Sequence, residues 1–197
     1  MTKLLGSLAI ALLVVAAPAQ AALFTLDDYT VTVHKTDPGL VLFANEILQT
    51  PADTGFSFTL DSVGESKTFT LFELGTRETA LNGDDLVPYS IEVDFDFSSP
   101  PPDFGGAADG ITGAGWFLTS FGYVVWDNPL VLQFGNYGLL GITLENATFG
   151  LPGSTKIDAT FTLLRADGGT TVVPEPASAL MLGVGVVALG AVRRRRT

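Results

Sequence analysis

The sequence predicts an all-β protein whose body is an antiparallel β-sandwich or a jelly-roll-like fold. Three observations carry this prediction: segments in which apolar and polar residues alternate, turn-forming residues between those segments, and no convincing apolar stripe at helical spacing in the body. Alternation with a period of two is typical of strands that have one buried and one exposed face, and it favours antiparallel pairing. The fourteen Phe residues, most of them in the body, would fill the space between two sheets.

The clearest alternation occurs in five segments of the body. They are residues 29–33, 56–60, 67–71, 91–97 and 155–163. In the fourth segment four apolar side chains share one face, and Glu92, Asp94 and Asp96 share the other. Turn formers such as Asn82-Gly83 separate the segments. Residues 40–48 fit either a helix or a strand.

Residues 98–115 do not show this alternation of apolar and polar residues. They are rich in Pro and Gly and are expected to form a long exposed loop that carries Asp103 and Asp109. The body is expected to span residues 22–166, and residues 167–172, which begin Asp-Gly-Gly, are expected to be a flexible linker.

The N-terminus reads as a signal peptide. A basic residue, Lys3, precedes an apolar stretch over residues 4–17, and the small residues Ala19 and Ala21 flank Gln20. This is the pattern that signal peptidase recognises, so residues 1–21 are expected to be removed and the body exported.

The C-terminal segment, residues 173–197, has three parts. It begins with Val173, Pro174, Glu175 and Pro176. An apolar run over residues 177–192 would span about 24 Å as a helix, which is a marginal crossing of a hydrocarbon core of about 30 Å. The last part is a basic cluster of Arg193, Arg194, Arg195 and Arg196. Because basic flanks stay on the cytoplasmic side, this segment is expected to be a single transmembrane anchor.

This order of Val-Pro-Glu-Pro, short apolar helix and arginine cluster resembles the PEP-CTERM sorting signal of exported bacterial proteins, which membrane proteases called exosortases recognise. The resemblance covers residues 173–197 and leaves an ordinary membrane helix as the alternative. It implies that residues 173–176 are the recognition segment and that the chain is held transiently in the inner membrane before processing. It further implies a Gram-negative host that makes exopolysaccharide, a candidate partner, and a mature body at the cell surface or in the extracellular matrix.

Composition excludes several function classes. Residues 22–176 contain five basic and twenty-one acidic residues, a formal charge of −16. Such a charge repels phosphates and argues against nucleic acid as a partner. The chain has no cysteine, so thiolate metal sites and disulfides are excluded, and an exported body must be stabilised by its hydrophobic core.

No catalytic arrangement stands out, and we expect that the protein is not an enzyme. His34 is the single histidine, and no Gly-x-Ser-x-Gly motif surrounds a serine. Glu92, Asp94 and Asp96 have a spacing that could serve acid–base hydrolysis. They are more simply a solvated face, which would also deter edge-to-edge pairing of sheets.

Two binding hypotheses remain beside a structural or interaction role. Asn82, Asp84 and Asp85 gather oxygen ligands of the kind that calcium prefers, although they also make a good turn, and no other cofactor is expected. Four aromatic side chains could stack on sugars, with core filling the favoured alternative: Trp116, Tyr123, Trp126 and Tyr137. The expected function is therefore an exported surface or matrix protein, and the alternative is an extracellular carbohydrate- or calcium-binding module.

Overall fold

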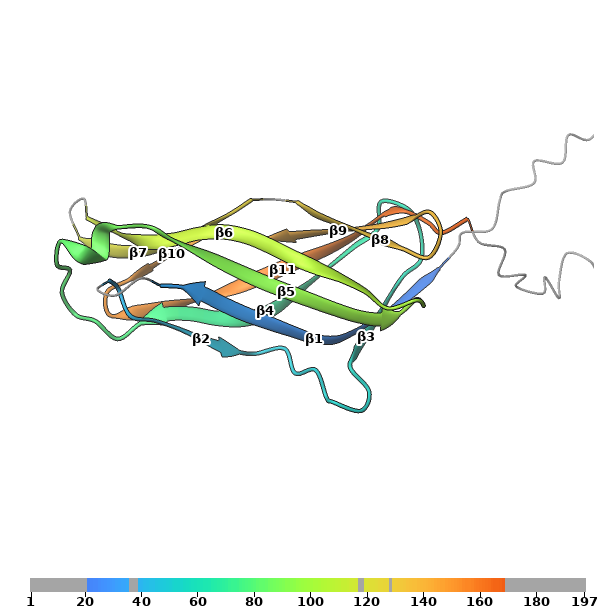
Figure 1. The fold of residues 1–197 in the computed structure, drawn as a ribbon, viewed down its shortest axis with the longest axis horizontal. Helices are drawn as coiled ribbons and strands as arrows, with labels where there is room; N and C mark the ends of the chain where they lie inside the picture. Colours follow the sequence, from blue (N-terminus) through green and yellow to red (C-terminus); the bar gives the residue numbers. More distant parts are fainter. Residues whose placement is uncertain (1–20, 36–38, 117–118, 128, 169–197) are drawn as a thin grey trace, which may run out of the picture.

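Two antiparallel sheets form the body, as the computed structural model shows for residues 21–35, 39–116, 119–127 and 129–168 (Figure 1). Sheet A has the strand order β10-β7-β6-β5-β1-β3. Its strands are Ala22–His34 (β1), Phe56–Leu60 (β3), Tyr89–Ser99 (β5), Phe104–Trp116 (β6), Ser120–Trp126 (β7) and Ala147–Gly150 (β10). Sheet B has the order β2-β4-β11-β9-β8. Its strands are Leu42–Glu46 (β2), Ser66–Thr76 (β4), Leu130–Phe134 (β8), Gly138–Leu144 (β9) and Gly153–Arg165 (β11).

This architecture confirms the all-β prediction. Each of the five alternating segments lies within a strand, and the ambiguous residues 40–48 contain β2. One short 3-10 helix, Asp84–Leu86 (η1), interrupts the connection between β4 and β5. Strands β1 to β5 alternate between the two sheets and then continue as the meander β5–β6–β7, so the strand order is that of a sandwich.

Phenylalanine side chains fill the space between the sheets, as the sequence predicts. The buried ones are Phe24, Phe58, Phe72, Phe95, Phe97, Phe134, Phe149 and Phe161. Ring contacts cross from one sheet to the other: Phe58 of β3 and Phe161 of β11 have centroids 5.0 Å apart, and Phe24 lies 5.1 Å from Phe134 of β8. Such pairs stabilise the core beyond the burial of their apolar area.

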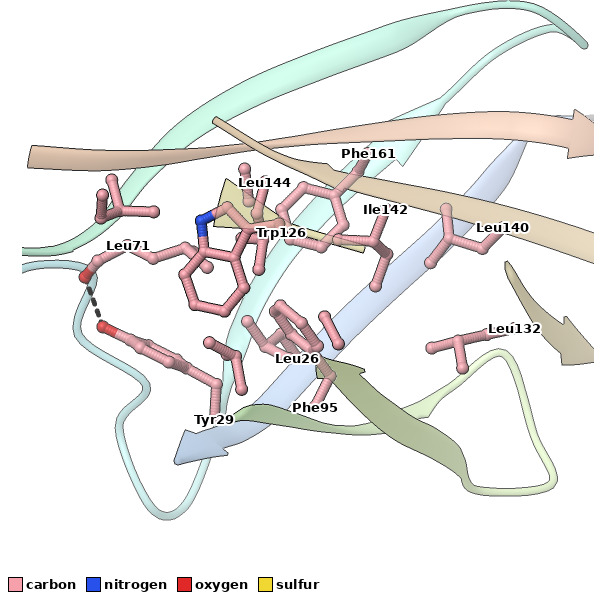
Figure 2. Close-up of a cluster of buried hydrophobic side chains, with 14 of the residues drawn as sticks. Leu26, Tyr29, Leu71, Phe95, Trp126, Leu132, Leu140, Ile142, Leu144 and Phe161 are labelled. Carbon is pink, nitrogen blue, oxygen red and sulfur yellow. Dashed lines mark hydrogen bonds between the residues drawn. The ribbon is translucent and has the colours of Figure 1, made fainter. Parts of the chain in front are cut away.

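Two polar groups are also buried in this core (Figure 2). The hydroxyl of Tyr29 in β1 donates to the carbonyl oxygens of Leu71 in β4 and, at 3.2 Å, of Leu48. The ring of Trp126 meets that of Phe72 edge to face at 6.4 Å, and its indole Nε1 has no hydrogen-bond partner among the described residues. The Tyr29 bond therefore satisfies a buried polar group and joins the sheets at the same time.

The prediction of a long exposed loop over residues 98–115 is wrong. Strand β5 runs to Ser99 and β6 begins at Phe104, so only residues 100–103 connect them. The glycines of β6 make room for neighbouring side chains: a Cβ on Gly106 would lie 2.8 Å from Leu132 Cδ2, and one on Gly110 would lie 2.7 Å from Trp126 Cε3. Glycine here reflects close packing, against the opposite sheet at Gly106 and against the neighbouring strand β7 at Gly110, and not a turn.

Both ends of the described body lie at the same end of the sandwich, called here the terminal end (Figure 1). At the start of β1, Ala22 pairs with Leu60, and near the end of β11 Thr162 pairs with Ser66. A short turn joins Leu60 to Ser66. The backbone N–H of Leu163 in β11 donates to the backbone carbonyl oxygen of Glu65 in this turn at 3.0 Å. The opposite end, called the distal end, carries η1.

Candidate functional site

The predicted sorting and export signals lie outside the described residues. This holds for the recognition segment 173–176, the apolar run 177–192, the arginines 193–196 and the signal-peptide residue Ala19. Strand β1 begins at Ala22, the residue after the predicted signal-peptidase site. Within the part of the chain that the structure describes, no helix has the length and apolar character that a membrane span requires.

The chain leaves the body at a set of contacts that we call the exit clamp, formed by residues 135–137 of the β8–β9 turn and by Arg165 and Asp167. Asp167 Oδ1 accepts the backbone N–H groups of Asn136 at 3.1 Å and Tyr137 at 3.0 Å. Arg165 Nε donates to the carbonyl oxygen of Tyr137. Asp167, predicted to begin a flexible linker, is therefore bonded to the body, and the point from which the tail extends is fixed.

The calcium candidates come together in the turn that starts η1. Asn82 Oδ1 accepts the N–H of Asp84 at 2.8 Å, and Asp85 Oδ2 accepts the N–H of Asn82 at 2.7 Å. Asp85 is 1% exposed. These oxygens accept N–H groups of the turn that leads into η1, which is what short Asn and Asp side chains commonly do in turns.

The arrangement of acidic side chains in the described residues gives no direct support to the calcium hypothesis. Among the described residues there is no set of three or more His, Cys, Asp or Glu side chains placed to hold a metal ion. Asp103 lies in the β5–β6 turn and Asp109 on β6, so these two do not join the candidate turn. Calcium binding at Asn82, Asp84 and Asp85 stays a prediction.

Glu92, Asp94 and Asp96 lie on the outer face of sheet A, as the alternation predicts. The strand that carries them, β5, lies between β1 and β6, so the suggestion that they deter edge-to-edge pairing is wrong. Cross-strand pairing adds Asp109 opposite Glu92 and Asp28 opposite Asp96. A hydrogen bond with Asp94 and the charge of that residue raise the pKa of Glu92. A shallow depression in this face is lined by Asp28, Thr30, Asp94 and Asp96.

His34 lies at the exposed end of β1, opposite Ser90 of β5. A serine nucleophile needs a hydrogen bond to its base. Among the described residues, the structure shows no hydrogen bond between His34 and Ser90. The geometry thus gives no support to nucleophilic catalysis at this place.

The aromatic side chains divide between core and surface. Trp126 is 4% exposed and fills the core, but core filling is wrong for Trp116 and Tyr137, which are 74% and 65% exposed. Trp116 ends β6 and Tyr137 lies in the β8–β9 turn, so neither is covered by the opposite sheet. Tyr123 and Trp126 point to opposite faces of β7, as predicted.

Sequence reasoning missed a contact on the outer face of sheet A. The rings of Phe121 and Tyr123 on β7 lie against Gly115 and Gly113 on β6. The sequence does contain a signal for it, since the glycines and the aromatic residues each recur at a period of two. The contact can be recognised from this pattern only when the register of the two strands is known.

Comparison with protein-family models matches the PEP-CTERM protein-sorting motif to residues 172–196. The match coincides with the segment 173–197 that the sequence pattern singled out, and the resemblance is thereby confirmed. Nothing matches among curated proteins or among solved structures. The body of the chain therefore has to be interpreted from its own residues.

Proposed function

We propose that this chain delivers a rigid, acidic β-sandwich to the cell surface or the extracellular matrix, where the body serves a structural or interaction role without catalytic turnover. The premise is that the chain carries a PEP-CTERM sorting motif and is thus an exported protein sorted by an exosortase. That match at residues 172–196, directly after the body, is the observation that carries the proposal. Signal peptidase would act at the other end of the chain, after Ala21.

The placement of the two chain ends supports this route. The described body begins and ends at the terminal end of the sandwich, and the exit clamp holds Asp167 there. From Gly168 to Val173 the chain can extend at most about 18 Å. While the tail is in the membrane, the terminal end therefore faces the bilayer and the distal end points away from it.

The surface of the body supports a role without turnover. The carboxylates of sheet A lie on an open face around a shallow depression, and His34 stands at a strand end. The formal charge of −16 on residues 22–176 keeps such a body soluble outside the cell and disfavours phosphate-rich partners.

The test is the fate of the body when the recognition segment is changed. In a bacterium that carries an exosortase, the full chain should leave the inner membrane, and a variant with Pro174→Ala and Pro176→Ala should stay there. A control with Thr170→Ala and Thr171→Ala, which lie just before the matched residues, should behave like the unchanged chain. Equal release of all three proteins would contradict sorting through this motif.

A further inference from the structure

The outer face of the β6–β7 hairpin carries a continuous apolar surface. On this face Phe121, Tyr123 and Val125 of β7 pair with Gly115, Gly113 and Ile111 of β6. Ile111 is 49% exposed and Val125 is 42% exposed. We call Ile111, Phe121, Tyr123 and Val125 the hairpin patch.

The two aromatic rings of the patch lie across the neighbouring strand. A Cβ on Gly113 would be 3.1 Å from Tyr123 Oη and 3.3 Å from Tyr123 Cζ. A Cβ on Gly115 would be 2.9 Å from Phe121 Cζ. Because glycine has no side chain, each ring can extend along the sheet surface over the partner strand. Positions 121 and 123 are about 7 Å apart along the strand, a spacing on the scale of a sugar ring.

Carboxylates border the hairpin patch on the side away from Phe121. Asp109 precedes Ile111 by two positions on β6 and pairs with Glu92 of β5. The backbone N–H of Asp127 donates to the carbonyl oxygen of Asp109 at 2.8 Å. Asp127, two positions after Val125, therefore lies beside Asp109. We call Glu92, Asp109 and Asp127 the acidic border.

The acidic border concentrates negative charge: Glu92 lies opposite Asp109, and His34 at the end of β1 is a basic side chain near enough to interact electrostatically with Glu92. Like charges that face each other across strands are unfavourable. Four other basic residues lie in or directly after strands of sheet B: Lys67, Arg77, Lys156 and Arg165. A bound cation would offset the repulsion among these carboxylates.

We propose that the hairpin patch and the acidic border together bind a polysaccharide that carries free amino groups. The C–H faces of its sugar rings would stack on Tyr123 and Phe121, whose ring faces carry partial negative charge. Its ammonium groups would pair with the carboxylates of the border in charge-assisted hydrogen bonds. This inference goes beyond the proposed function, because sorting does not require any ligand of the body.

Charge favours this occupant over the others that an apolar face could take. A second copy of the chain would bring one acidic border near another. An anionic membrane surface or a nucleic acid would place phosphates against the same carboxylates. A sugar polymer with amino groups matches the rings and the charges at once.

The test is calorimetric binding to the full chain in detergent, with three probes. Glucosamine oligomers should bind, and N-acetylglucosamine oligomers of the same length, which lack the charge, should bind at least tenfold more weakly. Oligolysine, which has charge but no sugar ring, should bind in a way that Tyr123→Ala does not change. Equal affinity for the two sugar oligomers, or no binding of either, would overturn the proposal.

Variants separate the two parts of the surface. Tyr123→Ala and the pair Glu92→Gln with Asp109→Asn should each weaken glucosamine-oligomer binding at least tenfold, and Tyr123→Phe should retain it. Tyr137→Ala, another exposed tyrosine, and Asp103→Asn are the matched controls and should bind normally. If Tyr123→Ala does not fold, the double variant Glu92→Gln with Asp109→Asn still tests the proposal, because it removes charge and leaves the rings in place. Unchanged glucosamine-oligomer binding in the double variant would refute the proposed binding site. The same conclusion would follow if Tyr123→Ala abolished self-association and had no effect on binding.

Discussion

The hydroxyl of Tyr29 in sheet A donates a hydrogen bond to the carbonyl oxygen of Leu71 in sheet B, so one side chain connects the two layers through the core (Figure 2). The Tyr29 side chain is 2% exposed, and the Leu71 carbonyl oxygen also accepts the backbone N–H groups of Ile47 at 2.8 Å and Leu48 at 2.9 Å, so it stays satisfied when the hydroxyl is removed. Tyr29→Phe should therefore lower the free energy of unfolding by about 0.5–1.5 kcal/mol, the net contribution of one hydrogen bond. Urea denaturation measures it, with Tyr137→Phe as a surface control that should change little. An unchanged midpoint for Tyr29→Phe would contradict the role given to this bond.

Stability should fall in strongly alkaline solution because of two buried tyrosines. Burial is the main cause that raises the pKa of Tyr29 and of Tyr89 to about 12 from 10.0. The folded state thus holds these protons more tightly than the unfolded state, and the stability they contribute is complete below pH 10 and is lost as pH rises toward 12. Thermal unfolding at several pH values should show this loss, and Tyr29→Phe should make it shallower. A loss of equal steepness in that variant would rule out Tyr29 as a cause.

The exit clamp depends on a glycine in the β8–β9 turn. Gly135 has a φ of +54°, and a Cβ at that position would lie 2.0 Å from Asp167 Oδ2. Gly135→Ala should therefore cost about 1–3 kcal/mol of stability and should release Asp167 from its two hydrogen bonds. Gly83→Ala is the control, because Gly83 has a φ of −64° and no atom within 4 Å of a Cβ. Hydrogen exchange at the amides of Asn136 and Tyr137 reports the release, and protected amides in Gly135→Ala would contradict it.

The turn at residues 82–85 should be stabilised by its own hydrogen bonds without calcium. Asp85→Ala should lower the melting temperature because it leaves the N–H of Asn82 without its acceptor, at a cost of about 1–3 kcal/mol. Millimolar calcium should leave the melting temperature of the unchanged protein where it is. Differential scanning calorimetry tests both statements. A rise with calcium that Asp84→Asn abolishes would favour the calcium-binding alternative.

The sequence was sufficient to predict those strands in which apolar residues mark the buried face and polar residues mark the exposed face. In β5 the alternation from Ile91 to Phe97 is complete, so the buried face and the acidic outer face followed directly. Strand β6 lacked that signal because glycine and alanine occupy most of its inner face, and the side chains that fill the space, Trp126 and Leu132, belong to other strands.

The sorting tail and the hairpin patch show the same difference between local and non-local information. The recognition segment beginning at Val173 is linear, so its residue order was enough to identify it. The hairpin patch and acidic border take residues from three strands, and Glu92, Asp109 and Asp127 become neighbours only through the strand register. For the same reason, exposure of Trp116 could not be predicted, since it depends on where the opposite sheet ends.

The central claim, that this chain is exported and sorted through its C-terminal motif, is tested most directly by the intact mass of the mature protein. The protein would be purified from a bacterium that carries an exosortase. The account predicts a mass that corresponds to a chain beginning at Ala22 and lacking Arg193 to Arg196. A mature protein that still ends at Thr197 would contradict processing by an exosortase and would indicate an ordinary membrane anchor.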